Sequence, residues 1–180
     1  MAGSAQPAPA VTPDASPSGA RDTRAVVERY QQLVYGLALS HTRCKGDADD
    51  VFQEVFLTYH RKQPNCHDEG HRQAWLITTT LTIARRENTS SWRTRVVPLA
   101  PEDAEMVRPE VFHFATETQD AVFQAVSQLP ESYRAVIHLF YFDDLPVARI
   151  AAVLGLEEGA VKMRLSRGRG LLRDQLGDLR

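Results

Sequence analysis

Five basic residues near the carboxyl end of the chain have the charge needed to hold the phosphates of a nucleic acid. They are Lys162, Arg164, Arg167, Arg169 and Arg173, and no acidic residue interrupts them between positions 159 and 173. Lysine and arginine donate hydrogen bonds to phosphate oxygens, and arginine can also read the edge of a guanine. The cluster therefore predicts a nucleic-acid contact, with a solvated basic helix face as the alternative reading.

The spacing of apolar residues places this cluster on the second helix of a helix-turn-helix. Apolar or small residues recur 4, 3 and 4 positions apart at Val161, Leu165, Gly168 and Leu172, which is the period of a buried helix face. A shorter apolar segment precedes them, and Gly155 separates the two because glycine readily ends a helix at positive φ. Two helices around a tight turn, the second one basic, are typical of a DNA-binding domain.

A helical projection gives the residues of the second helix their expected roles. With the apolar stripe facing inward, the outermost positions of the helix are Gly159, Met163, Ser166, Arg167 and Gly170. We expect Arg167 to reach a base edge, while Lys162, Arg164 and Arg169 on either side hold phosphates. The predicted duplex-binding set is Lys162, Met163, Arg164, Ser166, Arg167 and Arg169.

The bulk composition limits where such a surface can lie. The chain has 180 residues and a net charge of −2, so any nucleic-acid surface must be a local patch.

No run of about 18 apolar residues is present, which argues against a transmembrane helix. Residues 1–22 are rich in Ala, Pro, Ser and Gly and predict a disordered tail rather than a signal peptide. The two cysteines, Cys44 and Cys66, make no disulfide framework, so a reducing cytoplasm is the simplest location.

Helical periodicity extends over most of the remaining chain and divides it into two units. Apolar residues recur at helical spacing over 23–95 and again over 117–177, without strand-like alternation. Residues 96–116 instead carry prolines and acids, which predicts a flexible linker. The sequence therefore predicts an all-α protein of two small helical domains. In the first, Asp47 is expected to cap a helix whose buried face includes Val51 and Val55.

Three segments in this order resemble the sigma-70 family of bacterial RNA polymerase initiation factors, in its short extracytoplasmic-function group. DADDVFQEVFL at 47–57 is similar to the most recognisable segment of the group's first domain, and QAWLI at 73–77 with SSWRTRVVPL at 90–99 to its next segment. LPESYRAVIHLFYFDDLPVARIAAVLGLEEGAVKMRLSRGRGLL at 129–172 resembles the second domain almost end to end. The resemblance implies that 23–95 is a region 2-like domain and 117–177 a region 4-like helix-turn-helix domain.

The resemblance also implies a polymerase contact and a contact with the minus-ten element of a promoter. The segment that docks on the clamp of core RNA polymerase matches Asp47, Asp50, Gln53 and Glu54. An acidic helix face suits a basic partner, although a solvated face is the alternative and for Asp47 capping alone suffices. The segment that melts the minus-ten element and holds the unpaired strand matches Thr82, Arg85, Arg86, Trp92 and Arg93. Trp75 is expected in the core, and for Trp92 a DNA contact and a packing role stay open.

Three residues depart from what members of the group often carry. Thr82 and Arg86 replace an asparagine and an aspartate, which bears on minus-ten selectivity and melting. Met163 stands where serine is common, so the expected groove-facing position loses a hydroxyl. We therefore expect a shifted preference at the minus-thirty-five element.

Neither an enzyme nor a metal protein is expected from the motifs of this chain. Cys66, His67 and His71 are close in sequence, yet no C-x-x-C-like knuckle accompanies them, so a metal or oxidant sensor is only a rival reading. No nucleophile elbow, phosphate loop or HExxH motif is present. We expect no cofactor, and catalysis would belong to the polymerase that the chain escorts.

Together these inferences predict a cytoplasmic sigma factor that directs promoter-specific initiation, with the duplex-binding set on the minus-thirty-five element. Its expected partners are core RNA polymerase, promoter DNA and an anti-sigma factor that covers both domains. The acidic linker is expected to pass through the polymerase along the path of the RNA. The alternatives are a stand-alone helix-turn-helix regulator and a sigma-like protein that sequesters polymerase without initiating.

Overall fold

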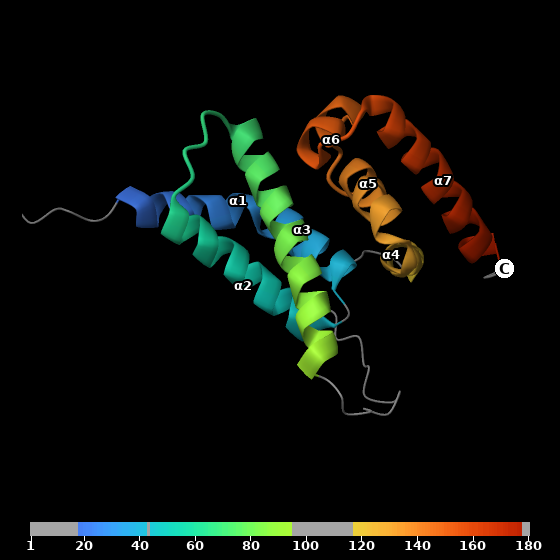
Figure 1. The fold of residues 1–180 in the computed structure, drawn as a ribbon, viewed down its shortest axis with the longest axis horizontal. Helices are drawn as coiled ribbons and strands as arrows, with labels where there is room; N and C mark the ends of the chain where they lie inside the picture. Colours follow the sequence, from blue (N-terminus) through green and yellow to red (C-terminus); the bar gives the residue numbers. More distant parts are fainter. Residues whose placement is uncertain (1–17, 43, 95–116, 178–180) are drawn as a thin grey trace, which may run out of the picture.

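The protein is built from helices that form two groups. The computed structural model describes residues 18–42, 44–94 and 117–177, and all regular structure in these ranges is helical (Figure 1). The N-terminal bundle consists of α1 (Ser18–His41), α2 (Lys45–Lys62) and α3 (Glu69–Thr94). The C-terminal bundle consists of α4 (Glu117–Gln128), α5 (Glu131–Tyr141), α6 (Val147–Leu154) and α7 (Glu158–Gly177). The all-α prediction is confirmed.

The predicted tail and linker fall largely outside the described residues. Helix α1 begins at Ser18, so residues 18–22 belong to a helix and the boundary predicted for the tail is too late. The remainder of the tail, and the predicted linker at 96–116, lie outside the ranges that the structure describes.

The N-terminal bundle closes around the apolar faces that the sequence spacing indicates. Val34 of α1, Val51 and Val55 of α2, and Leu76 of α3 have no exposed surface. Edge-to-face aromatic contacts extend this core, with the rings of Tyr59 and Trp75 5.6 Å apart. The close packing of these buried side chains holds α2 and α3 side by side.

The start of α2 differs from the sequence prediction. Cys44, rather than Asp47, is its N-cap, and the Cys44 Sγ accepts a hydrogen bond from the Asp47 backbone N–H at 3.5 Å. Asp49 accepts a hydrogen bond from the Tyr35 hydroxyl at 2.7 Å, which ties α2 to α1. The helix therefore begins at Lys45, and Asp47 lies buried in its first turn.

The C-terminal bundle contains the predicted helix-turn-helix. Helix α6 ends at Gly155, which adopts φ 64° and ψ 40°, the left-handed conformation expected of a glycine cap. Val161 and Leu165 of α7 are buried, as their spacing predicts. Gly168 lets α7 approach α5 closely, because a Cβ there would meet the Ile137 Cγ1 at 2.9 Å. Gly155 thus forms the turn between α6 and α7, and Gly168 allows the close contact of α7 with α5.

The two bundles lie against each other in the described structure. The carboxyl half of α1 is beside α4 and α5, and α3 is beside α6 (Figure 1). Leu37 of α1 and Ile77 of α3 have no exposed surface, and both belong to the apolar core of the C-terminal bundle. The sequence predicted two domains but not that they share buried apolar contacts.

Candidate nucleic-acid interface

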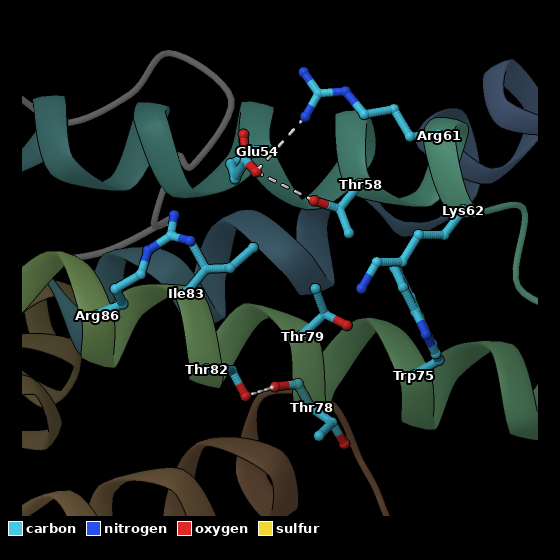
Figure 2. Close-up of a pocket in the computed structure, with 10 residues that line it drawn as sticks. All are labelled: Glu54, Thr58, Arg61, Lys62, Trp75, Thr78, Thr79, Thr82, Ile83 and Arg86. Atoms are coloured by element: carbon cyan, nitrogen blue, oxygen red, sulfur yellow. Dashed lines mark hydrogen bonds and ion pairs between the residues drawn. The ribbon is translucent and has the colours of Figure 1, made fainter.

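A groove of about 430 Å³ lies between α2 and α3 on the surface of the N-terminal bundle (Figure 2). Its wall on α2 consists of Glu54, Thr58, Arg61 and Lys62. Its wall on α3 consists of Trp75, Thr78, Thr79, Thr82, Ile83 and Arg86. The lining therefore combines three cations with a single carboxylate, an indole ring and a row of threonines.

The cations of the groove come from both helices. Arg61 and Lys62 are in the last turn of α2, and Arg86 is more than two turns beyond Trp75 on α3, so positive charge lies at both ends of the groove (Figure 2). All three side chains are exposed. A groove with cations along its length and an aromatic ring in its wall suits a single nucleic-acid strand, because phosphates and bases need different partners.

The carboxylates near these cations hold them weakly. Glu54 accepts a hydrogen bond from the Thr58 hydroxyl at 3.3 Å and lies 3.9 Å from the Arg61 guanidinium. Arg86 lies 3.3 Å from the Glu87 carboxylate. Exposed ion pairs of this kind contribute about 0–1 kcal/mol, so a phosphate can replace the carboxylate as partner.

Thr78 and Thr82 of α3 present acceptors and methyl groups rather than donors. The Thr78 hydroxyl donates to the Ala74 carbonyl at 2.9 Å, and the Thr82 hydroxyl donates to the Thr78 carbonyl at 2.7 Å. A hydroxyl has only one hydrogen to give. In this arrangement Thr82 can accept a hydrogen bond from a base but has no hydrogen left to donate to one.

The groove contains only some of the residues that were predicted to bind the minus-ten element. Thr82 and Arg86 line it, whereas Arg85 points to the C-terminal bundle, with its guanidinium 2.7 Å from the Glu131 carboxylate. Trp92 and Arg93 belong to the last turn of α3, and their side chains lie outside the described residues. Trp75, expected in the core, packs against that core and also lines the groove.

Arg61 and Lys62 are the two cations of the groove that sequence reasoning missed. Both residues follow the segment that resembles the polymerase-docking part of the family. The sequence therefore predicted a polymerase contact for α2 but no DNA contact. The run of Tyr59, His60, Arg61 and Lys62 at the end of α2 was the available signal. This basic run indicates a nucleic-acid contact only once the carboxyl end of α2 is known to lie beside Trp75 of α3.

The residues predicted to bind polymerase do not share one exposed face. Asp50 and Gln53 are exposed on α2, whereas Asp47 is buried at the start of the helix. Glu54 is half-buried and faces the groove, where Thr58 and Arg61 contact it (Figure 2). Asp50 and Gln53 are therefore the members that the fold presents to a partner.

Helix α7 presents the predicted duplex-binding residues on its outer face. Met163 is 48% exposed, and Ser166 and Arg167 are also exposed, whereas Arg164 is half-buried. The Lys162 ammonium lies 3.7 Å from the Glu158 carboxylate. The Arg169 guanidinium lies 6.0 Å from the centre of the Tyr141 ring, a cation–π contact with a partly exposed ring. Of the six predicted duplex-binding residues, all except Arg164 are thus exposed.

The cysteine and histidine residues weighed for metal binding do not assemble in the described structure. The rings of His67 and His71 stack with centres 5.6 Å apart. Within residues 18–42, 44–94 and 117–177, no group of three or more potential metal ligands occurs. Nor, across the same ranges, does any helix combine the length and apolar character that a bilayer crossing requires.

Comparison with known proteins identifies the family of this chain. Models of sigma-70 region 2 and sigma-70 region 4 match residues 26–96 and 119–172. The ECF RNA polymerase sigma factor SigW of Bacillus subtilis is 30% identical over 165 residues, which are 86% of this chain and 88% of SigW. SigE of Mycolicibacterium smegmatis is 33% identical over 160 residues, which are 84% of this chain and 60% of that longer protein.

A solved structure has the same fold. It contains the sigma factor RpoE in complex with the anti-sigma factor NepR from Bartonella quintana, and it matches with a TM-score of 0.60 and 23% identity. The match covers 87% of this chain and 98% of that one. The family that the sequence segments resemble is thus confirmed: this chain belongs to the ECF RNA polymerase sigma factors.

Proposed function

We propose that this chain is a cytoplasmic promoter-specificity subunit, which binds core RNA polymerase and directs transcription initiation. The observation that carries the proposal is the presence of two different basic surfaces in one chain. One is the groove between α2 and α3, and the other is the outer face of α7. A stand-alone regulator would need only the second.

The two surfaces suit two different forms of DNA. The groove offers Trp75 for stacking and Arg61, Lys62 and Arg86 for phosphates, which favours the unpaired strand of a melted minus-ten element. The outer face of α7 offers Arg167 and Met163 to base edges in a major groove, as in other helix-turn-helix proteins. On this proposal the duplex that α7 reads is the minus-thirty-five element. The chain itself supplies no catalysis.

Polymerase and an anti-sigma factor are the proposed protein partners. Asp50 and Gln53, exposed on α2, are the residues we assign to the polymerase contact. The anti-sigma partner is supported by the likeness in fold to a sigma factor solved with an anti-sigma factor. An acidic linker in the path of the RNA remains our proposal for residues 96–116.

The test is run-off transcription with core polymerase and a promoter library. We expect transcripts from the wild-type protein and a loss of at least roughly tenfold for Arg86→Glu, because the reversed charge repels phosphates that the arginine attracts. Arg24→Glu is the matched control, since Arg24 is an exposed arginine that pairs with Glu28 on α1 and does not line the groove.

The same assay separates the proposal from its rivals. Polymerase binding without transcripts from any promoter would favour an initiation-defective protein that sequesters polymerase. Specific duplex binding without polymerase binding would favour a stand-alone regulator. Equal transcription by Arg86→Glu and wild type would remove the groove from the mechanism.

A change at Met163 should alter the sequence preference of α7. We expect Met163→Ser to shift the preferred base at one minus-thirty-five position by about 1 kcal/mol, roughly fivefold, because a hydroxyl can donate or accept where a thioether contacts methyl groups. Selection of binding sites from a randomised duplex by the polymerase complex would measure the shift. Identical selected sequences would show that Met163 does not face the bases.

A further inference from the structure

Most threonine hydroxyls of the groove between α2 and α3 have already given their hydrogen to a partner inside the protein. Four threonines line the groove, namely Thr58, Thr78, Thr79 and Thr82. Thr58 donates to the Glu54 carboxylate at 3.3 Å. Thr78 and Thr82 donate to backbone carbonyls one helical turn earlier, at 2.9 and 2.7 Å. Because a hydroxyl has one hydrogen and two lone pairs, these three can accept a hydrogen bond from a ligand while keeping the bond that they make now.

Glu54 adds a charged acceptor on the α2 wall of the groove. Its side chain is 36% exposed and faces the groove across from α3 (Figure 2). The contacts that hold it, with Thr58 and with Arg61, both involve its Oε1 atom. The Oε2 atom is therefore available to accept a hydrogen bond from a ligand. Each wall of the groove thus offers an acceptor, Glu54 on α2 and Thr82 on α3.

The cations of the groove do not by themselves distinguish one base from another. Arg61, Lys62 and Arg86 are exposed and suit the phosphates of a strand, which every nucleotide carries. Stacking on Trp75 is also tolerant of sequence, because every base has a π-face. Base selection in the groove therefore depends on the groups that form hydrogen bonds with base edges, and Glu54 and Thr82 are acceptors.

An acceptor distinguishes the DNA bases by their exocyclic amino groups. Adenine, cytosine and guanine each carry one, whereas thymine carries carbonyl oxygens and a methyl group instead. The single ring N–H of thymine lies between its two carbonyls. An acceptor that meets a carbonyl leaves both groups without a partner and removes water from both, which is unfavourable. Thymine is therefore the base that fits these two side chains worst.

We propose that Glu54 and Thr82 read an exocyclic amino group on the unpaired strand and reject thymine at that position. The inference rests on the proposed function, since it presumes that the groove holds the melted minus-ten strand. To serve a carbonyl, Thr82 would have to break its bond to the Thr78 carbonyl, and an ionised Glu54 has no hydrogen to give. An asparagine at position 82 would instead present both a donor and an acceptor.

Binding of single strands to the full chain, measured by fluorescence anisotropy without polymerase, tests the inference. The probes are strands of deoxycytidine, deoxyuridine or thymidine, each of roughly 12 nucleotides. They carry the same phosphates and differ in the base, and deoxyuridine separates the loss of the amino group from the gain of a methyl group. We expect the deoxycytidine strand to bind at least roughly fivefold more tightly than the other two, because one hydrogen bond is gained.

Variants of the two acceptors should remove this preference. Thr82→Val keeps the shape of the side chain without its hydroxyl, and Glu54→Gln adds an N–H donor. We expect each change to lower the ratio of the two affinities, and the double variant to bind deoxycytidine and deoxyuridine strands equally. Thr89→Val is the matched control. Thr89 is exposed on α3 and donates to the Arg85 carbonyl at 3.0 Å, yet it does not line the groove.

The outcomes separate this inference from the proposed function. Equal binding of the three strands by wild type, a preference kept in full by the double variant, or an absence of single-strand binding would each overturn the inference. Circular dichroism shows whether every variant keeps the helical fold, and Thr82→Asn provides a further surface variant, which should gain affinity for the deoxyuridine strand. Run-off transcription is measured separately, so a wild type that prefers deoxycytidine but initiates at no promoter would remove only the proposed function.

Discussion

Replacing Gly168 with valine is expected to destabilise the C-terminal bundle by about 3 kcal/mol. The first added atom, a Cβ, would lie 2.9 Å from the Ile137 Cγ1 and 3.1 Å from its Cδ1. Ile137 is 1% exposed and lies in the apolar core of the C-terminal bundle. Overpacking of a tight core costs about 1–3 kcal/mol, and a β-branched residue adds a penalty in a helix. Helix α7 must therefore move away from α5 or lose part of its packing.

Gly170 provides the matched control, because it lies in the same helix with open space around it. A Cβ at position 170 would meet nothing within 4 Å. Gly170→Ala should leave the free energy of unfolding unchanged or raise it by up to about 1 kcal/mol, since alanine favours a helix more than glycine does. Urea unfolding followed by circular dichroism measures both variants. Equal stability of Gly168→Val and wild type would mean that α7 does not pack on α5 as described.

Acidification is expected to cost the protein about 2 kcal/mol through His41 between pH 7 and pH 5. His41 is 3% exposed, and burial, reinforced by Arg134, lowers its pKa from 6.5 to about 4. The unfolded chain therefore binds a proton at His41 that the folded chain does not. The stabilisation is fully present above pH 6.5 and is lost as the pH falls towards 4. The charged groups around His41 are Arg134, Glu131 and Arg85, and the neighbouring His138 is also buried and neutral.

The variant His41→Gln isolates this effect from other titrating groups. Burial raises the pKa of Asp143 to about 7, which makes its contribution to stability fall with rising pH, opposite in sign to that of His41. Comparing wild type with His41→Gln cancels Asp143 and the remaining carboxylates. We expect the free energy of unfolding to fall more steeply towards pH 5 in wild type than in the variant. Parallel pH profiles would refute a neutral, buried His41.

Local spacing was sufficient to predict the helices and most of their buried faces. Val161 and Leu165 followed from helical periodicity, and Gly155 followed from the need for a left-handed residue between α6 and α7. These features depend on residues a few positions apart. The start of α2 did not follow, because Cys44 caps the helix through its Sγ although aspartate is the more favoured residue at an N-cap.

The candidate groove could be predicted only in part, because it depends on contacts between distant segments. Thr82 and Arg86 were predicted from the resemblance to the family's minus-ten segment, whereas Arg61 and Lys62 join them through the pairing of α2 with α3. The sequence of α3 does not show which of Arg85 and Arg86 faces the groove, because the partners of both come from other helices. The two arginines diverge because successive residues on a helix point about 100° apart, so one meets Glu131 and the other the groove.

The shared core around Leu37 and Ile77 has a consequence for building hybrid proteins. The family models divide the chain into two modules, yet each of these residues is an N-terminal side chain that completes the interior of the C-terminal module. In a chimera that joins residues 26–96 to region 4 of a relative, Leu37 and Ile77 would pack against a surface whose shape does not match them. Exchange of the modules must therefore carry Leu33, Leu37, Ile77 and Leu81 together with the helices that they complete.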